Sequence, residues 1–166
     1  EKVILKNAVK FGVNSDKFEG NTYFEGNVKF EHKGSILTSD YVIWYKELNF
    51  IKAIGNVRLQ NADGSVITSE EMEYDGNTQK GIARKNVVLQ DTKQTINTET
   101  LYYDRINNKA YYNTGGTITD PTNVMYSTSG TYDLSTKMIN FSDNVKINNT
   151  DYTVTGSNII QNQNNN

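Results

Sequence analysis

Few residues of this chain have the side chains that catalysis or metal binding requires. His32 is its only histidine, and there is no cysteine. A zinc site and a histidine-based catalytic triad both need partners that the chain lacks, and disulfide and thiolate chemistry are excluded. Because His32 precedes Lys33-Gly34, which is typical of a turn, we expect it to be an exposed loop residue.

Acidic residues recur instead at one place in a repeating pattern. Glu70 and Glu71 form a pair of the kind that can act in acid–base catalysis, but Asp40 and Glu99 occupy the corresponding places in neighbouring units. We therefore interpret the pair as structural. The segment Asp75-Gly76-Asn77 has too few ligands for a calcium loop and favours a turn. The sequence predicts a protein that is not an enzyme and uses no metal or cofactor.

Charge and hydropathy exclude further classes of function. The 166 residues include 17 Lys and Arg and 19 Asp and Glu, for a net charge of −2, and the basic residues form no cluster. Binding to nucleic acid and docking on anionic membranes both depend on such clusters. No run of about 20 apolar residues exists to span a bilayer. The sequence begins at Glu1 without an apolar leader, so we expect any signal peptide to have been removed.

The most informative pattern is a repeat of about 29 residues. Its anchor is a valine, or a threonine in the fourth unit, and the anchoring positions 28, 57, 87, 117 and 145 are separated by 29, 30, 30 and 28 residues. Such a period is typical of repeat architectures, in which each unit buries its apolar face against its neighbours. We expect one domain over residues 1–159, followed by a disordered Asn- and Gln-rich tail over residues 160–166. A second apolar series keeps the period, at Leu37, Ile67, Ile96, Met125 and Val154.

Each unit contains about three short strands. Val57 and Leu59 alternate with polar residues, and Asp63-Gly64 supplies a tight hairpin turn. In the next strand Ile67 and Met72 are five apart, so both face one core only if a bulge or corner shifts the phase of the strand between them. Such corners are expected at residues 39–40, 69–70, 98–99 and 156–157. They imply two facing sheets, and therefore an all-β antiparallel jellyroll of about fifteen strands, with a β-solenoid as the alternative.

The interior between the sheets has two interpretations. One is a packed core. The other is a groove for an apolar ligand, because hydrophobic residues make up only 36% of the chain and several inner positions are small, at Ser39, Ala53, Ser69, Ala83 and Gly130. The residues expected to line this space are Val28, Phe30, Leu37, Val42, Trp44, Val57, Leu59, Ile67, Met72, Tyr74, Val87, Leu89, Leu101 and Tyr103.

The order of the motifs is similar to that of a known family. The motifs are Gly26-Asn27-Val28, Leu37-Thr38-Ser39-Asp40, Ala53-Ile54-Gly55-Asn56-Val57, Ile67-Thr68-Ser69-Glu70, Tyr74-Asp75, Tyr103-Asp104 and Tyr132-Asp133. Together, over about residues 26 to 159, they resemble the OstA-like family of periplasmic lipopolysaccharide-transport proteins. The fourth unit departs from the family pattern, because Gly116 and Thr117 stand where it has Asn and Val.

The resemblance implies an open, twisted jellyroll in the periplasm. Its two sheets would shield the acyl chains of lipid A while lipopolysaccharide travels to the outer membrane. Each acyl methylene exposed to water costs about 0.8 kcal/mol, which gives the shielding its physical reason. The resemblance also implies that edge strands pair with further copies, as a homo-oligomer, or with homologous jellyroll domains.

Several alternatives stay open. A polysaccharide-binding β-solenoid would display aromatic residues and carboxylates on an outer face. A purely structural repeat protein would have a dry, tightly packed interior. Within the family, the sequence leaves three identities open. The chain is the soluble protein that bridges the periplasm, a membrane-tethered relative of it, or the N-terminal part of the outer-membrane partner.

Overall fold

The protein is all-β over the residues that the computed structural model describes, which are 2–13, 21–149 and 153–162. All 14 strands of this part belong to one antiparallel sheet, and the only helix in it is a short 3-10 turn, η1 (Lys46–Leu48). The strands are β1 (Ile4–Asn7), β2 (Lys10–Val13), β3 (Thr22–His32), β4 (Ser35–Tyr45), β5 (Phe50–Gln60), β6 (Val66–Asp75), β7 (Lys80–Gln90), β8 (Thr95–Asp104), β9 (Lys109–Tyr112), β10 (Gly116–Thr119), β11 (Asn123–Ser127), β12 (Ser129–Asp133), β13 (Met138–Asn149) and β14 (Thr153–Asn162).

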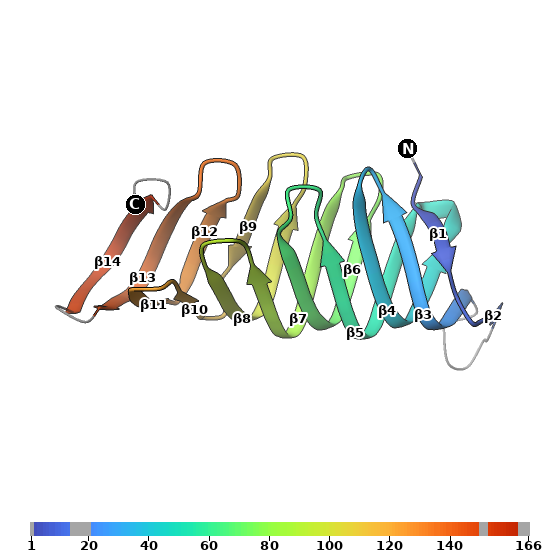
Figure 1. Ribbon diagram of the computed structural model, residues 1–166, viewed down its shortest axis with the longest axis horizontal. Coiled ribbons are helices and arrows are strands. Elements are labelled where there is room, and N and C mark those ends of the chain that lie inside the picture. The colour runs from blue at the N-terminus through green and yellow to red at the C-terminus, as the bar shows by residue number, and fades with distance from the viewer. Residues whose placement is uncertain (1, 14–20, 150–152, 163–166) are drawn as a thin grey trace.

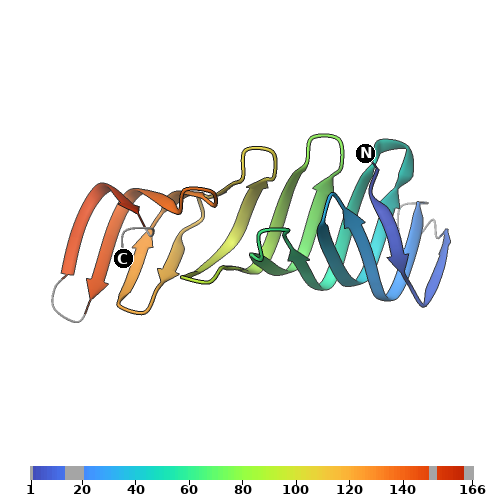
Figure 2. The ribbon, with the colours of Figure 1, turned by 45° about the horizontal axis from the view of Figure 1, so that its top comes forward.

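The strands cross the long axis of an elongated molecule. β1 and β2 lie at one end of the molecule and β14 at the other (Figure 1, Figure 2). Every pairing between these strands is antiparallel, so they do not form the parallel rungs of a β-solenoid. β14 extends to Asn162, three residues into the segment expected to be a disordered tail. Residues 163–166 of that segment lie outside the described part.

A line along the sheet divides each long strand into two halves. The first half of β3 pairs with β2, and the second half pairs with β1. Farther along, β8 pairs with β10 through residues 95–98 and with β9 through residues 102–104. β13 pairs with both β12 and β11 in the same way. The short strands are therefore halves that end at the dividing line.

The dividing line is a row of β-bulges, which we call the crease. On β5, Gly55 and Asn56 have positive φ angles of 84° and 47°, and together they face the single residue Glu70 of β6. Glycine and asparagine adopt such angles more readily than other residues do. A bulge puts one additional residue into a strand and bends the sheet there. Equivalent pairs with positive φ lie at Gly26-Asn27, Lys85-Asn86 and Asp143-Asn144.

Side chains across the crease hold the bulges in place. Asn56 Nδ2 donates to Asp40 Oδ2 over 2.9 Å, and Asn86 Nδ2 donates to Glu70 Oε1 over 2.8 Å. Lys85 Nζ forms an ion pair with Glu71 Oε1 at 3.1 Å. The acidic pair of β6 therefore has structural partners, as its recurrence in the sequence predicts.

The crease folds the sheet into two arms that face each other. The first arm comprises β1, β10, β11 and residues 28–39, 57–69, 87–98, 145–149 and 153–156; the second arm comprises β2, β9, β12 and residues 22–25, 41–54, 71–84, 100–104, 138–142 and 158–162. The ring of Phe30 on the first arm lies 5.6 Å from the ring of Trp44 on the second, centroid to centroid. The interior is therefore enclosed by one folded sheet, where the sequence pattern had implied two separate ones.

The sequence predicted that apolar residues five apart on a strand both face the interior, and this is confirmed. The bulge that accompanies this change of phase lies on a different strand from the one expected. Leu37 and Val42 of β4 are five residues apart and are 4% and 0% exposed, so both face the interior. The additional residue sits on the neighbouring strand, in the Gly26-Asn27 pair opposite Asp40. The sequence motif Gly-Asn is thus the bulge itself, and the residues first expected to form the corner lie opposite it.

Candidate functional site: the interior between the arms

The side chains expected to line the interior do come together there. Thirteen of the fourteen are buried, and Trp44 is partly buried against them. Together with other buried residues of both arms they form one continuous apolar cluster. The first arm contributes Val28, Phe30, Leu37, Val57, Leu59, Ile67, Val87 and Leu89, and the second arm contributes Val42, Trp44, Met72, Tyr74, Leu101 and Tyr103.

Several small inner residues lie at places that the protein itself fills. Tyr112 is 2% exposed, and its ring lies against Gly116 and Gly130. A Cβ atom added to Gly130 would lie 2.5 Å from that ring, and one added to Gly116 would lie 2.6 Å from it. The glycines therefore make room for a tyrosine from the neighbouring strand. At Ser69 the small side chain makes a local hydrogen bond instead, since its Oγ donates to the backbone oxygen of Glu71 over 2.8 Å.

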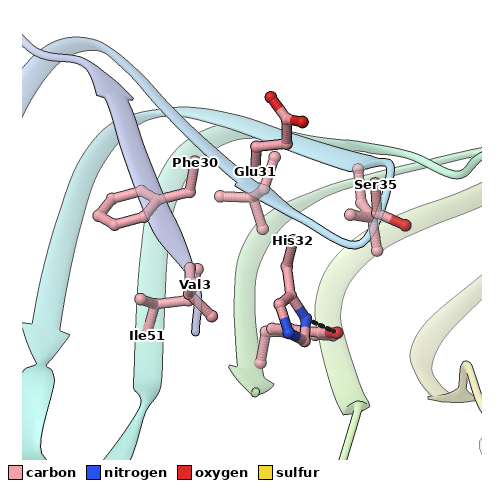
Figure 3. A pocket seen from close by; sticks show the side chains of 9 residues that line it. Val3, Phe30, Glu31, His32, Ser35 and Ile51 are labelled. Carbon is pink, nitrogen blue, oxygen red and sulfur yellow. Dashed lines mark hydrogen bonds between the residues drawn. The ribbon is translucent and has the colours of Figure 1, made fainter. Parts of the chain in front are cut away.

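The interior holds very little free space. A cavity of about 10 Å³, close to the volume that one water centre occupies, lies between Phe30, His32, Ile51 and Tyr74 (Figure 3). The packed-core interpretation therefore describes this conformation. Trp44 retains one unused polar group, because its buried Nε1 has no hydrogen-bond partner.

His32 is not the exposed loop residue that the sequence suggested. It is 4% exposed, and its Nδ1 lies 2.8 Å from the hydroxyl of Tyr74 on the opposite arm, the bond drawn dashed in Figure 3. Burial raises the pKa of Tyr74 to about 12, and the nearby Arg105 opposes this shift only in part. The tyrosine is therefore neutral at physiological pH, and its hydrogen bond with His32 joins the two arms.

The long edge opposite the crease, which we call the mouth, is closed by side chains. Arg105, in the turn after β8, reaches the turn between β3 and β4. Its Nε donates to Ser35 Oγ over 3.1 Å, and its Nη2 donates to the backbone oxygen of Lys33. Its Nη1 also donates to Gln79 Oε1 over 2.8 Å. One guanidinium thus ties three turns together across the mouth.

A second contact closes the mouth farther along. Asp91, in the turn after β7, accepts a hydrogen bond from the hydroxyl of Tyr132 and lies 3.4 Å from Lys137 Nζ. Burial opposes ionisation of Asp91, but the bonds from Tyr132 and from the backbone N–H groups of Lys93 and Gln94 outweigh it, so its pKa is below the ordinary value. Asp91 is therefore a buried carboxylate that is paired from the opposite arm.

These closing residues escaped the sequence analysis. Arg105 follows the Tyr103-Asp104 motif at a place where the unit before it has a glycine, Gly76. The sequence did carry a signal for Arg105, because an arginine replaces the glycine that the preceding unit has at this turn. A residue that makes a contact at only one place along the molecule is not expected to recur in every unit.

In the described ranges, no group of metal-binding side chains is present, and no helix is long and apolar enough to cross a membrane.

The match to a family model agrees with the sequence motifs. A family model described as "OstA-like protein" matches residues 1–157. A search of curated proteins found no match. Among solved structures, the chain is similar to LptH, described as the LptA homologous periplasmic component of the lipopolysaccharide transport device of Pseudomonas aeruginosa, with 12% identity, a TM-score of 0.35, and coverage of 86% of this chain and 83% of that chain. Because the family model matches nearly the entire length, the chain belongs to the OstA-like family.

Proposed function

We propose that the protein is a non-enzymatic periplasmic carrier of lipopolysaccharide that covers lipid A acyl chains between its two arms. The observation that carries this proposal is the continuous apolar interior, which follows the long axis and belongs to both arms. Membership of the OstA-like family supports the same function. In this proposal the folded sheet is an open jellyroll of repeated units of about 29 residues.

The filled interior requires the arms to part before a lipid enters. The crease is continuous backbone, so parting occurs at the mouth, where Arg105 and Asp91 make the closing contacts. An ordinary hydrogen bond contributes only about 0.5–1.5 kcal/mol net, or up to about 3 kcal/mol when a charged group takes part. Each acyl methylene removed from water gains about 0.8 kcal/mol. A chain of ten or more methylenes gains roughly 8 kcal/mol, which is comparable with the free energy that these bonds contribute.

The two ends of the sheet are the proposed sites of assembly. At the first end, Phe11 and Val13 of β2 are 78% and 70% exposed. Exposed edge strands invite pairing with another strand. We infer that this end pairs with β14 of a further copy or with a homologous jellyroll domain. A row of such units would give acyl chains a continuous covered path.

One alternative function also has support. A purely structural repeat protein needs a dry, closely packed interior, and the cavity of about 10 Å³ between the arms fits that requirement. The two functions differ in whether the interior accepts an amphiphile. Binding experiments therefore separate them.

The test is site-specific photo-crosslinking. A photoreactive residue at Val57, Leu59 or Met72, which are at most 4% exposed, should capture lipopolysaccharide or a lipid A analogue. The same residue at Lys29 or Arg58, which point outward on the arm that carries Val57 and Leu59, should not. Equal capture at inward and outward positions of folded variants would overturn the proposal. No capture at any inward position, with the fold intact in thermal melts, would favour the structural alternative.

A charge in the interior gives an independent check. Met72→Asp would put an unpaired carboxylate where acyl chains pass, and it should weaken capture at Val57 while destabilising the fold by a few kcal/mol. Met72→Leu is the matched control, because it keeps an apolar side chain of similar size and should leave capture unchanged. Unchanged capture in a folded Met72→Asp variant would contradict the proposed path.

A further inference from the structure

Two tyrosines reach across the interior from neighbouring strands of the second arm. Tyr112 lies on β9 and Tyr132 on β12, and each is 2% exposed. These two strands pair with each other and cross the molecule between β8 and β13 (Figure 1). The hydroxyl of Tyr112 bonds to Ser127 Oγ, and the hydroxyl of Tyr132 donates to Asp91. Both rings are therefore attached at their far ends to the first arm.

Tyr112 fills the part of the interior beside the crease, because β9 ends at Tyr112 and β10 begins at Gly116. Its ring lies so close to Gly116 of the first arm and Gly130 of the second that neither has room for a Cβ atom. Ser127 Oγ donates to the backbone oxygen of Ser129 over 2.7 Å, so Tyr112 is the donor in its own bond to Ser127. The ring is thus enclosed by backbone, and displacing it would leave a buried hydroxyl unpaired.

The inner row of the second arm is different before β9. On β5 and β7 this row has the small residues Ala53 and Ala83. Their neighbours in the row are Met72 of β6 and Leu101 of β8, whose side chains are aliphatic. Such side chains change rotamer without losing a hydrogen bond, so an acyl chain displaces them more easily than it displaces Tyr112. The interior from β1 to β8 is therefore the part that opens more readily to a lipid.

Tyr132 fills the part of the interior beside the mouth, next to Tyr112. Gly130, which pairs with Tyr112, lies two residues before Tyr132 on the same strand. Asp91 holds the hydroxyl of Tyr132 and also pairs with Lys137, whose Nζ lies 5.8 Å from the centre of the Tyr132 ring. The two rings therefore close the interior together, one beside each long edge. Only the contact of Tyr132 lies at the edge that is proposed to part.

We propose that Tyr112 and Tyr132 form a gate across the interior, which holds acyl chains on the side of β1 to β8. This inference rests on the proposed function, because it concerns acyl chains that have entered the interior. Tyr112 is the fixed half of the gate, and Tyr132 is the half that opens when its bond to Asp91 is released. An acyl chain that enters where Arg105 parts from the first arm therefore waits at the gate until Asp91 also releases Tyr132. Transfer along a row of units then requires a separate opening step in each unit.

The experiment compares photo-crosslinking on the two sides of the gate. Phe30 of β3 and Phe141 of β13 are matched positions before and beyond it, because both are phenylalanines and are 1% and 0% exposed. A photoreactive phenylalanine replaces one or the other in the full chain, which is then incubated with a lipid A analogue. We expect capture at Phe141 to be at most about one fifth of that at Phe30, because at least one hydrogen bond must break before a chain passes.

The possible failures are distinguishable. Equal capture at Phe30 and Phe141, or greater capture at Phe141, would overturn the gate while the proposed function stands. No capture at either position, with the fold intact in thermal melts, would overturn the proposed function and the gate with it.

Variants of the two tyrosines identify the halves of the gate. Tyr132→Phe keeps the ring and removes only the bond to Asp91, so it should raise the ratio of capture at Phe141 to capture at Phe30 by about fivefold. Tyr112→Leu removes the ring and the hydroxyl beside the crease, and it should also raise this ratio. A lower stability acts on both crosslinking positions of one variant, whereas release of the gate changes their ratio.

Leu101→Ala is the control for loosened packing. Leu101 is 1% exposed in the same inner row, on β8, so its truncation leaves a void before the gate and leaves both tyrosine hydroxyls bonded. It should not change the ratio of capture. An unchanged ratio in Tyr132→Phe, or an equal rise in Leu101→Ala, would overturn the assignment of the gate to these tyrosines.

Discussion

The crease and the mouth close the same interior along opposite edges, and they do so by different means. The crease repeats one backbone device, a pair of residues with positive φ angles, at Gly26-Asn27, Gly55-Asn56 and Lys85-Asn86. Among the described residues, the contacts that cross the mouth do not repeat from unit to unit. The mouth is closed at separate points by single side chains, among them Arg105 and Asp91.

The difference teaches how such a fold can be stable and still open. A bend made by backbone bulges in β3, β5, β7 and β13 cannot be released without breaking the sheet. A closure made by a few side chains can be released while the backbone pairing of the sheet stays intact. The crease therefore fits the role of a permanent edge, and the mouth fits the role of the edge that parts for a ligand.

The largest effect is expected from a substitution in the crease. Gly55 has a φ of 84°, and an added Cβ would lie 2.7 Å from Asp40 Oδ2 and 3.1 Å from Asp40 Cβ. Gly55→Ala should lower the free energy of unfolding by about 2–4 kcal/mol, because backbone strain and a clash act together. Gly64→Ala is the control, since Gly64 has a φ of 89° but nothing within 4 Å of the added atom. It should cost about 1 kcal/mol in urea unfolding; equal losses in the two variants would remove the special role of the crease.

A smaller loss of stability, with greater access to the interior, is expected at the mouth. Arg105→Gln removes the bonds to Ser35 and Lys33 and should lower the free energy of unfolding by about 1–3 kcal/mol. Hydrogen exchange should quicken near His32 and Tyr74 more than at the crease. The control is Arg58→Gln, because the guanidinium of Arg58 donates to the exposed Gln60 on its own strand, and the change should alter the free energy of unfolding by less than about 0.5 kcal/mol. Uniformly faster exchange in Arg105→Gln would show that the mouth does not open independently.

The smallest effect is a pH dependence at the second closing contact. The folded-state pKa of Asp91 is lowered overall by its hydrogen bonds, so ionised Asp91 stabilises the fold above the ordinary aspartate pKa of about 3.9. That contribution is lost as the pH falls through the lowered pKa. The stability difference between the wild type and Asp91→Asn should therefore be greatest near neutral pH and should shrink below about pH 4. Urea unfolding at several pH values measures it, and a constant difference would exclude the buried carboxylate as its source.

The sequence was a good guide to which side chains face inward. Alternation along a strand, together with the five-residue spacing of pairs such as Ile67 and Met72, placed both in the interior, where they are 0% and 2% exposed. The same reasoning placed Tyr74 and Tyr103 inward. These assignments succeed because the direction of a side chain on a strand depends on its position along that strand.

The amount of free space inside could not be predicted in this way. Gly130 marked a small inner position, but whether a ligand or a protein side chain fills it depended on Tyr112 of another strand. The outward direction of Tyr111, the residue before Tyr112, was predictable, because two consecutive residues on a strand face opposite sides of the sheet. Which adjacent strands bring Tyr102 and Tyr111 together followed only from the sheet order.

By itself, therefore, the sequence determined the all-β class, the inward residues, the family motifs and the existence of a phase shift between paired apolar residues. These properties are local, since each depends on a few consecutive residues and on the backbone angles that glycine and asparagine permit. Only the tertiary structure decided that one sheet folds onto itself and that its mouth is closed. Arg105 lies 70 residues from Ser35, and Tyr132 lies 41 residues from Asp91. Contacts over such separations depend on how the whole sheet twists and folds, and no repeat of neighbouring residues encodes them.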